Sequence, residues 1–124
     1  MFDKELVQAI LLQVDEAIEK IRSRTAHIHT PDYFASTPEG MEKLDAVAML
    51  FMAVGESVKN IDKITGGTLL AKRPEIDWTG VKGFRDIIAH HYFDIDAEQV
   101  FWILKHNLDP LSKAIKRIIA ELAD

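Results

Sequence analysis

The sequence has 124 residues, which predicts one domain over residues 1–124 with a single hydrophobic core. It has no cysteine, which excludes disulfides, thiolate metal sites and a cysteine nucleophile. The formal net charge of −5 argues against broad, non-specific nucleic-acid binding, so any nucleic acid would need a local basic patch. Because no signal-like N-terminus and no apolar run of about 18–20 residues is present, we expect a cytoplasmic protein without a membrane segment.

The first expected helix covers residues 4–24, where apolar side chains recur every three or four positions from Leu6 to Ile21. Asp3 is the expected N-cap of this helix. The following stretch, HIHTPDYFASTPEG, contains two prolines and a polar cluster that break the periodicity, so we expect a loop there.

The second expected helix begins with Thr37 as N-cap and Pro38 in the first helical position. Its apolar positions continue from Leu44 to Ile61, and Gly66 with Gly67 should end it. A second apolar set lies off this stripe and consists of Ala46, Met49, Leu50 and Ala53. A helix that is apolar on two sides is either central in a bundle or part of a subunit contact, and both interpretations stay open.

The second half of the chain predicts a linker with one helical turn at residues 68–77, then a helix over 78–92 capped by Asp77. Gly80 and Gly83 in this helix would allow close approach by a neighbouring backbone. The next helix should be capped by Asp96, and its apolar stripe continues past Pro110 with a kink or a very short break. We therefore expect an all-α up-and-down bundle of four long helices, or five if Pro110 divides the last.

One short stretch, RDIIAHHYFDID, carries the candidate chemistry. On a regular helix Arg85 and Tyr92 share a face within about 20°, whereas Arg85 and His90 lie roughly 140° apart. A single straight helix would therefore not direct Arg85 and His90 to one phosphate. The two could act together because arginine is long, if the helix ends near His90, or if a symmetric dimer completes the site, and we favour the last two together.

The residue types suit phosphodiester cleavage without a metal or cofactor. A guanidinium such as Arg85 stabilises negative charge on phosphate oxygens, and His90 can transfer a proton near neutral pH. Asp86, one turn before His90, could orient the imidazole. The remaining histidines, His27, His29 and His106, show no paired acidic spacing for a metal site. The structural alternative is that Arg85 pairs with an acid and His90 caps a helix C-terminus.

The wider stretch RPEIDWTGVKGFRDIIAHHYFDID resembles the signature of the HEPN superfamily in its HepT toxin branch. The matching residues are Pro74, Ile76, Trp78, Gly83, Arg85, His90, Tyr92, Phe93, Ile95 and Asp96. The segments LDAVAMLFMAVGESVKNI, which contains Glu56, and VFWILKHNLDPL resemble the neighbouring helices of that family. His91 departs from the pattern, since relatives often have an acid there.

This resemblance implies an all-α homodimer in which the Arg–His motifs of two subunits face one cleft. It implies a metal-independent ribonuclease toxin with Arg85 and His90 as catalytic residues, and Asp86, Glu56 and His91 in support. The implied antitoxin is an MntA-like minimal nucleotidyltransferase that silences the toxin by placing AMP on the motif tyrosine, here Tyr92.

Two other functions stay open at this point. The chain could be a non-catalytic helical partner of a nucleotidyltransferase, which the acidic net charge and the second apolar face of residues 41–63 would suit. It could also be a structural dimer in which the motif is accidental.

Overall fold

The computed structural model describes residues 2–91 and 93–124. Over these residues the chain forms six α-helices and one 3₁₀ turn, without β-strands. In chain order the elements are α1 (Lys4–Thr25), α2 (Asp32–Ser36), α3 (Pro38–Thr65), η1 (Leu70–Lys72), α4 (Trp78–His90), α5 (Ala97–His106) and α6 (Leu108–Ala123). The predicted all-α class is confirmed.

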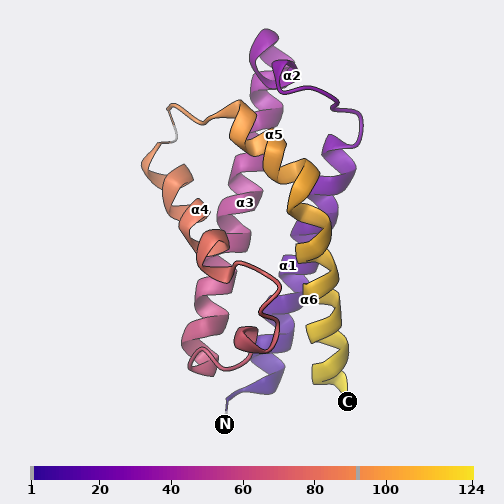
Figure 1. The fold of residues 1–124 in the computed structure, drawn as a ribbon, viewed down its shortest axis with the longest axis vertical. Helices are drawn as coiled ribbons and strands as arrows, with labels where there is room; N and C mark the ends of the chain where they lie inside the picture. Colours follow the sequence, from indigo (N-terminus) through magenta and orange to yellow (C-terminus); the bar gives the residue numbers. More distant parts are fainter. Residues whose placement is uncertain (1, 92) are drawn as a thin grey trace.

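The long helices α1, α3 and α6 form the body of the bundle, with α1 packed against both α3 and α6 (Figure 1). Helix α4 packs along α3 on the side away from α1, and α5 crosses the upper part of the bundle before α6 descends beside α1 (Figure 1). The core is built from the predicted stripes, and its fully buried members include Leu11, Ile18, Ile21, Val47, Val58, Ile61, Ile115 and Ile118. Among the described residues, no helix is both long and apolar enough to cross a membrane.

The predicted helix ends are confirmed where capping chemistry defines them. Asp3 Oδ1 accepts a hydrogen bond from the Leu6 amide at 3.1 Å, and Thr37 Oγ1 accepts one from the Gly40 amide at 3.0 Å. Such caps typically contribute about 1 kcal/mol each to helix stability. Gly66 ends α3 with φ 63°, a left-handed conformation that favours glycine.

Two predictions about the helices were incomplete. The stretch expected as a loop contains the short helix α2, whose Phe34 is fully buried against the core. A five-residue helix is too short to show a periodic pattern, so burial of one aromatic side chain defines it instead. The break between α5 and α6 falls at Asn107, and Pro110 lies in the first turn of α6, where its missing N–H is not needed. Over the described residues the bundle therefore has six α-helices, where four or five were expected.

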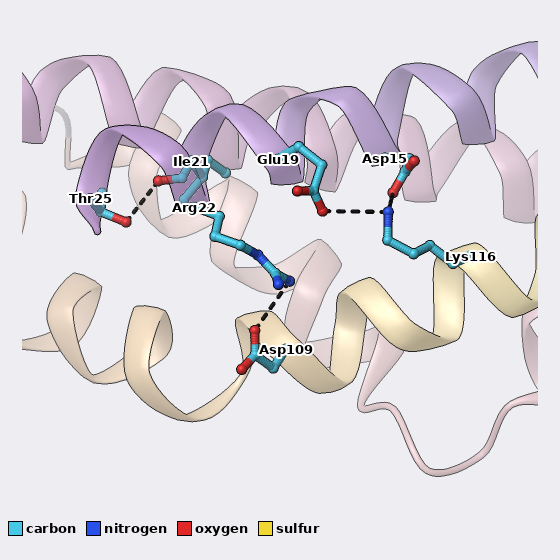
Figure 2. Close-up of polar contacts among 7 residues, drawn as sticks. All are labelled: Asp15, Glu19, Ile21, Arg22, Thr25, Asp109 and Lys116. Atoms are coloured by element: carbon cyan, nitrogen blue, oxygen red, sulfur yellow. Dashed lines mark hydrogen bonds and ion pairs between the residues drawn. The ribbon is translucent and has the colours of Figure 1, made fainter. Parts of the chain in front are cut away.

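Polar contacts join α1 to α6 along the surface of the bundle (Figure 2). Lys116 Nζ lies 2.7 Å from Asp15 Oδ1 and 3.4 Å from Glu19 Oε1, and the hydrogen bond with Asp15 is the main cause that raises the Lys116 pKa. Arg22 pairs with Asp109 at 3.1 Å. These side chains keep between 25% and 74% of their surface accessible, so the ion pairs add little to stability.

Helix α3 is central, since α1, α2 and α4 all pack against it. Within one chain its second apolar set is nevertheless open to solvent: Ala46, Met49 and Ala53 are exposed, and Leu50 is half-buried. Met49 alone keeps 65% of its surface accessible. The central position and the exposed second face are therefore both present in α3.

Candidate functional site

Local sequence determines where α4 begins and ends. Asp77 Oδ1 accepts a hydrogen bond from the Gly80 amide at 2.9 Å, and the Trp78 indole donates to the Arg73 carbonyl at 2.9 Å. The helix ends at His90, two residues before the expected end, and the amide of the C-cap His91 donates to the carbonyls of Ile87 and Ile88. Arg85 to His90 therefore form the end of α4, and Asp96, the last residue of the candidate stretch, caps α5.

Arg85 lies at the contact between α4 and α3, with 30% of its side chain exposed. Its Nε is 3.0 Å from Glu56 Oε2 of α3, in an ion pair whose angle does not make a directed hydrogen bond. Its Nη1 donates to Asp86 Oδ1 at 3.1 Å. The structure thus brings together three of the predicted site residues, Arg85, Glu56 and Asp86.

Lys59 of α3 completes this cluster, although it was not predicted from the sequence. Its Nζ donates to Asp86 Oδ1 at 3.0 Å, the same oxygen that accepts from Arg85. The bonds from Lys59 and then Arg85 hold the pKa of the Asp86 carboxyl below its usual range. Asp86 is therefore ionised at neutral pH and bound by two cations.

A second ion pair crosses the same two helices farther along. Lys82 Nζ of α4 lies 2.6 Å from Asp62 Oδ2 of α3, so an α4 lysine meets an α3 acid here, the reverse of the Lys59–Asp86 pair. The order of contacts shows that α3 and α4 run antiparallel, because residue numbers rise along α4 as they fall along α3. Arg85 is consequently held in a network that spans both helices.

The two histidines are placed differently from Arg85. His90 is the last residue of α4 and is exposed, and in the described part of the chain no hydrogen bond joins it to Asp86 or another side chain. His91 is also exposed and lines a cavity of about 170 Å³ between α4 and α5, together with Asp94 and Gln99. Orientation of His90 by Asp86 stays a prediction, and Tyr92 lies outside the described residues. An ion-paired arginine and a histidine at a helix C-terminus also fit the alternative in which both residues have a structural role and no catalytic one.

In the described part of the chain, Arg85, His90, Glu56 and Asp86 line neither the cavity of about 170 Å³ nor a larger one nearby. A cavity of about 550 Å³ lies between α3, α4 and the α5–α6 junction, but its lining is mostly apolar and includes none of Arg85, His90, Glu56 and Asp86. The charged cluster lies instead on a partly exposed surface.

Comparisons with known proteins identify a family and several related proteins. The family model described as "Ribonuclease HepT-like" matches residues 14–118, which include all six candidate residues. A Methanocaldococcus jannaschii protein named "Putative RNase" is 31% identical over 77 residues, 62% of this chain and 60% of the relative. A second protein of that name and organism is 30% identical over 79 residues, 64% of this chain and 65% of the relative.

A third relative from the same organism is named "Gamma-glutamylcyclotransferase and putative RNase" and is 28% identical over 116 residues, 94% of this chain and 49% of the relative. The chain thus matches less than two thirds of the length of each of these relatives. No solved structure matches the chain at a significant level.

Proposed function

Because the chain belongs to the ribonuclease HepT-like family, we propose that it cleaves RNA and that Arg85 and His90 carry the reaction without a metal ion. The observation that supports this most directly is the partly exposed guanidinium of Arg85, held by carboxylates at the α3–α4 contact five residues before the exposed His90. Two of the relatives are named as RNases, which supports the same class of substrate.

The proposed reaction needs a group that takes a proton from the attacking oxygen, a group that gives a proton to the leaving oxygen, and a cation that stabilises the negative charge on the phosphate. An RNA 2′-oxygen loses its proton and attacks the adjacent phosphorus, while the leaving 5′-oxygen gains a proton. His90 is the group that can accept or donate these protons near neutral pH. Arg85 stabilises the charge that develops on the phosphate oxygens, since its guanidinium is permanently charged and forks onto two oxygens.

We propose that a homodimer assembles the site. Met49, Ala53 and Glu56 follow at spacings of four and three, so they lie along one side of α3, and Glu56 is the partner of Arg85. The first two of these side chains are exposed in one chain. A symmetric contact over this side of α3 would bring the Arg85 clusters of two copies to one cleft. In such a dimer, Arg85 of one subunit and His90 of the other could act on the same phosphate, although the two residues point in different directions on one helix.

The resemblance to the HepT toxin branch extends the proposal to regulation. The chain would act as the toxin of a toxin–antitoxin pair, and an MntA-like nucleotidyltransferase would silence it by transferring AMP to Tyr92. Each transferred AMP adds a phosphate, and therefore negative charge and bulk, two residues after His90 in the sequence. The modified protein should repel RNA at the site where the unmodified protein binds it.

A second candidate function is a non-catalytic partner module for a nucleotidyltransferase. The net charge of −5 favours it, and so does the exposed apolar side of α3, which could bind another protein instead of a second copy. This function requires neither the proton transfer of His90 nor the charge of Arg85.

Cleavage of end-labelled RNA by purified protein distinguishes these functions, provided that its mass shows an unmodified chain. Wild type should cleave, and both Arg85→Ala and His90→Ala should lose at least about a hundredfold in rate. Lys82→Ala is the matched control, because it removes another α3–α4 ion pair without touching Arg85. Intact RNA with wild type would favour the partner module, whereas equal cleavage by all four proteins would contradict the roles of Arg85 and His90.

A further inference from the structure

One carboxylate oxygen of the cluster lies between two cationic side chains, as an oxygen of a bound anion would. Asp86 Oδ1 lies 3.0 Å from Lys59 Nζ and 3.1 Å from Arg85 Nη1, so a single oxygen bridges cations from two helices. A phosphate oxygen requires the same surroundings, since it also binds a guanidinium and an ammonium at this distance. The side chain of Asp86 therefore occupies a position at which another anion would be bound.

We propose that Lys59 and Arg85 together bind one RNA phosphate, and that Asp86 occupies this phosphate position in the RNA-free protein. The inference rests on the proposed ribonuclease function and deepens it. It assigns Lys59 as a substrate-binding residue and Asp86 as a built-in competitor of the substrate, rather than as a supporting catalytic acid.

The exposure of the three side chains allows such an exchange. Arg85, Lys59 and Asp86 keep 30%, 39% and 45% of their side-chain surface accessible, so an incoming phosphate can reach both cations and the carboxylate can rotate into solvent. Glu56 contacts a different nitrogen of Arg85, Nε, and can keep the guanidinium oriented while Nη1 changes partner. The exchange replaces one anion by another, so neither cation is left unpaired.

The second ion pair on these helices provides a comparison. Lys82 and Asp62 are less accessible, at 29% and 24%, and among the described residues no ion pair joins either of them to Arg85. Both lysines join α3 to α4, so loss of either should affect the packing of the helices similarly. Only the loss of Lys59 should affect a phosphate bound to Arg85.

The competitor role and the support role predict opposite results for Asp86→Asn. The amide has nearly the shape of the carboxylate but no negative charge, so it binds the two cations more weakly. If Asp86 competes with RNA, Asp86→Asn should bind RNA more tightly. If Asp86 supports substrate binding, the same substitution should weaken binding or leave it unchanged.

The test is a double-mutant cycle that measures binding, with a short single-stranded 2′-O-methyl oligoribonucleotide as probe. This probe cannot be cleaved through a 2′-hydroxyl, so the dissociation constant is measured apart from catalysis. Wild type, Lys59→Ala, Asp86→Asn and the double variant form the cycle, with Lys82→Ala as control. The melting temperature of each variant confirms that it is folded.

We expect Lys59→Ala to weaken binding roughly tenfold and to reduce the slope of log K against log salt by about 0.7, the contribution of one single-strand phosphate contact. The tenfold loss should persist in the Asp86→Asn background, and Asp86→Asn alone should tighten binding severalfold. If the Lys59→Ala effect disappears in that background, Lys59 acts only through Asp86 and the inference is wrong. Weaker or unchanged binding by Asp86→Asn would also overturn it.

Arg85→Ala separates failure of this inference from failure of the proposed function. If Arg85→Ala binds the probe as wild type does, the cluster is not an RNA site and the proposed function fails with it. If Arg85→Ala weakens binding while Lys59→Ala does not, RNA binds at the cluster and only the role of Lys59 is wrong.

Discussion

A Cβ atom placed on Gly55 would lie 2.4 Å from the Cβ of Arg85 and 3.1 Å from the Val81 carbonyl oxygen. Helices α3 and α4 therefore approach so closely at the arginine that only a residue without a side chain fits opposite it. The position of the guanidinium next to Glu56 depends on this approach. The glycine that places Arg85 is thus in α3, on the helix that does not carry the motif.

Gly55→Ala should push α4 away from α3 and so both destabilise the fold and displace Arg85. The methyl group would meet the Arg85 side chain and a carbonyl, and the carbonyl cannot move without the helix. Urea denaturation should show a loss of about 1–3 kcal/mol, and RNA cleavage should fall. Gly83→Ala is the control, because a Cβ there meets nothing within 4 Å. This control should gain up to about 1 kcal/mol from helix propensity. Equal effects of the two substitutions would show that the close approach at Gly55 is unimportant.

Met49→Asp should separate the proposed dimer into folded monomers and reduce RNA cleavage. The substitution places a charge in the middle of the exposed apolar side of α3, where a symmetric partner would bury it unpaired. Light scattering coupled to size-exclusion chromatography measures the mass, and the cleavage assay follows on the same fractions. Leu12→Asp is the control, since Leu12 is 51% exposed on a different helix, α1. A fully active monomer would contradict the shared cleft.

Tyr92→Phe should keep the ribonuclease active and remove its silencing by a nucleotidyltransferase. Phenylalanine lacks the hydroxyl that accepts AMP, while the reaction assigned to Arg85 and His90 does not use that hydroxyl. Incubation with an MntA-like enzyme and ATP should raise the mass of wild type by AMP units and stop cleavage. Under the same conditions Tyr92→Phe should keep both its mass and its cleavage. Silencing of the variant would place the modification at another residue.

Acid should weaken the α3–α4 contact through Asp86. Lys59 and then Arg85 lower the folded-state pKa of this carboxyl, so its stabilising contribution is present above the ordinary aspartate pKa of about 3.9. This contribution is lost as the pH falls from the ordinary aspartate pKa through the lower pKa of Asp86 in the folded protein. Thermal melting between about pH 5 and pH 2 should therefore show a shallower loss of melting temperature for Asp86→Asn than for wild type. Parallel curves would mean that the ion pairs of Asp86 add nothing to stability.

The bundle could be predicted from the sequence because its helices are long and their ends carry capping residues. The stripe of α1 and the caps Asp3, Thr37 and Asp77 act locally, and the structure confirms them. Helix α2 could not be predicted in this way, because burial of Phe34 in a tertiary contact stabilises it. The close approach by a neighbouring backbone that was expected at Gly80 and Gly83 is found at Gly55 instead. Gly83 faces open space, and a Cβ on Gly80 would meet its own cap residue, Asp77.

The candidate site was predictable only in part, for a similar reason. Arg85, Asp86 and Glu56 were selected from the motif and its family resemblance, and the structure places them in contact. Lys59 was missed because a lone lysine on a half-exposed helix position carries no signal in the sequence. Lys59 contacts Asp86, which lies 27 positions away in the sequence. Only the antiparallel packing of α3 and α4 creates this contact.

The most direct measurement is the rate of RNA cleavage in excess EDTA by unmodified wild type and by His90→Ala, with and without added imidazole. The account predicts that wild type cleaves, that His90→Ala does not, and that imidazole restores part of the lost rate by supplying the missing proton transfer. Intact RNA with wild type, or equal rates for the two proteins, would contradict metal-independent cleavage by His90.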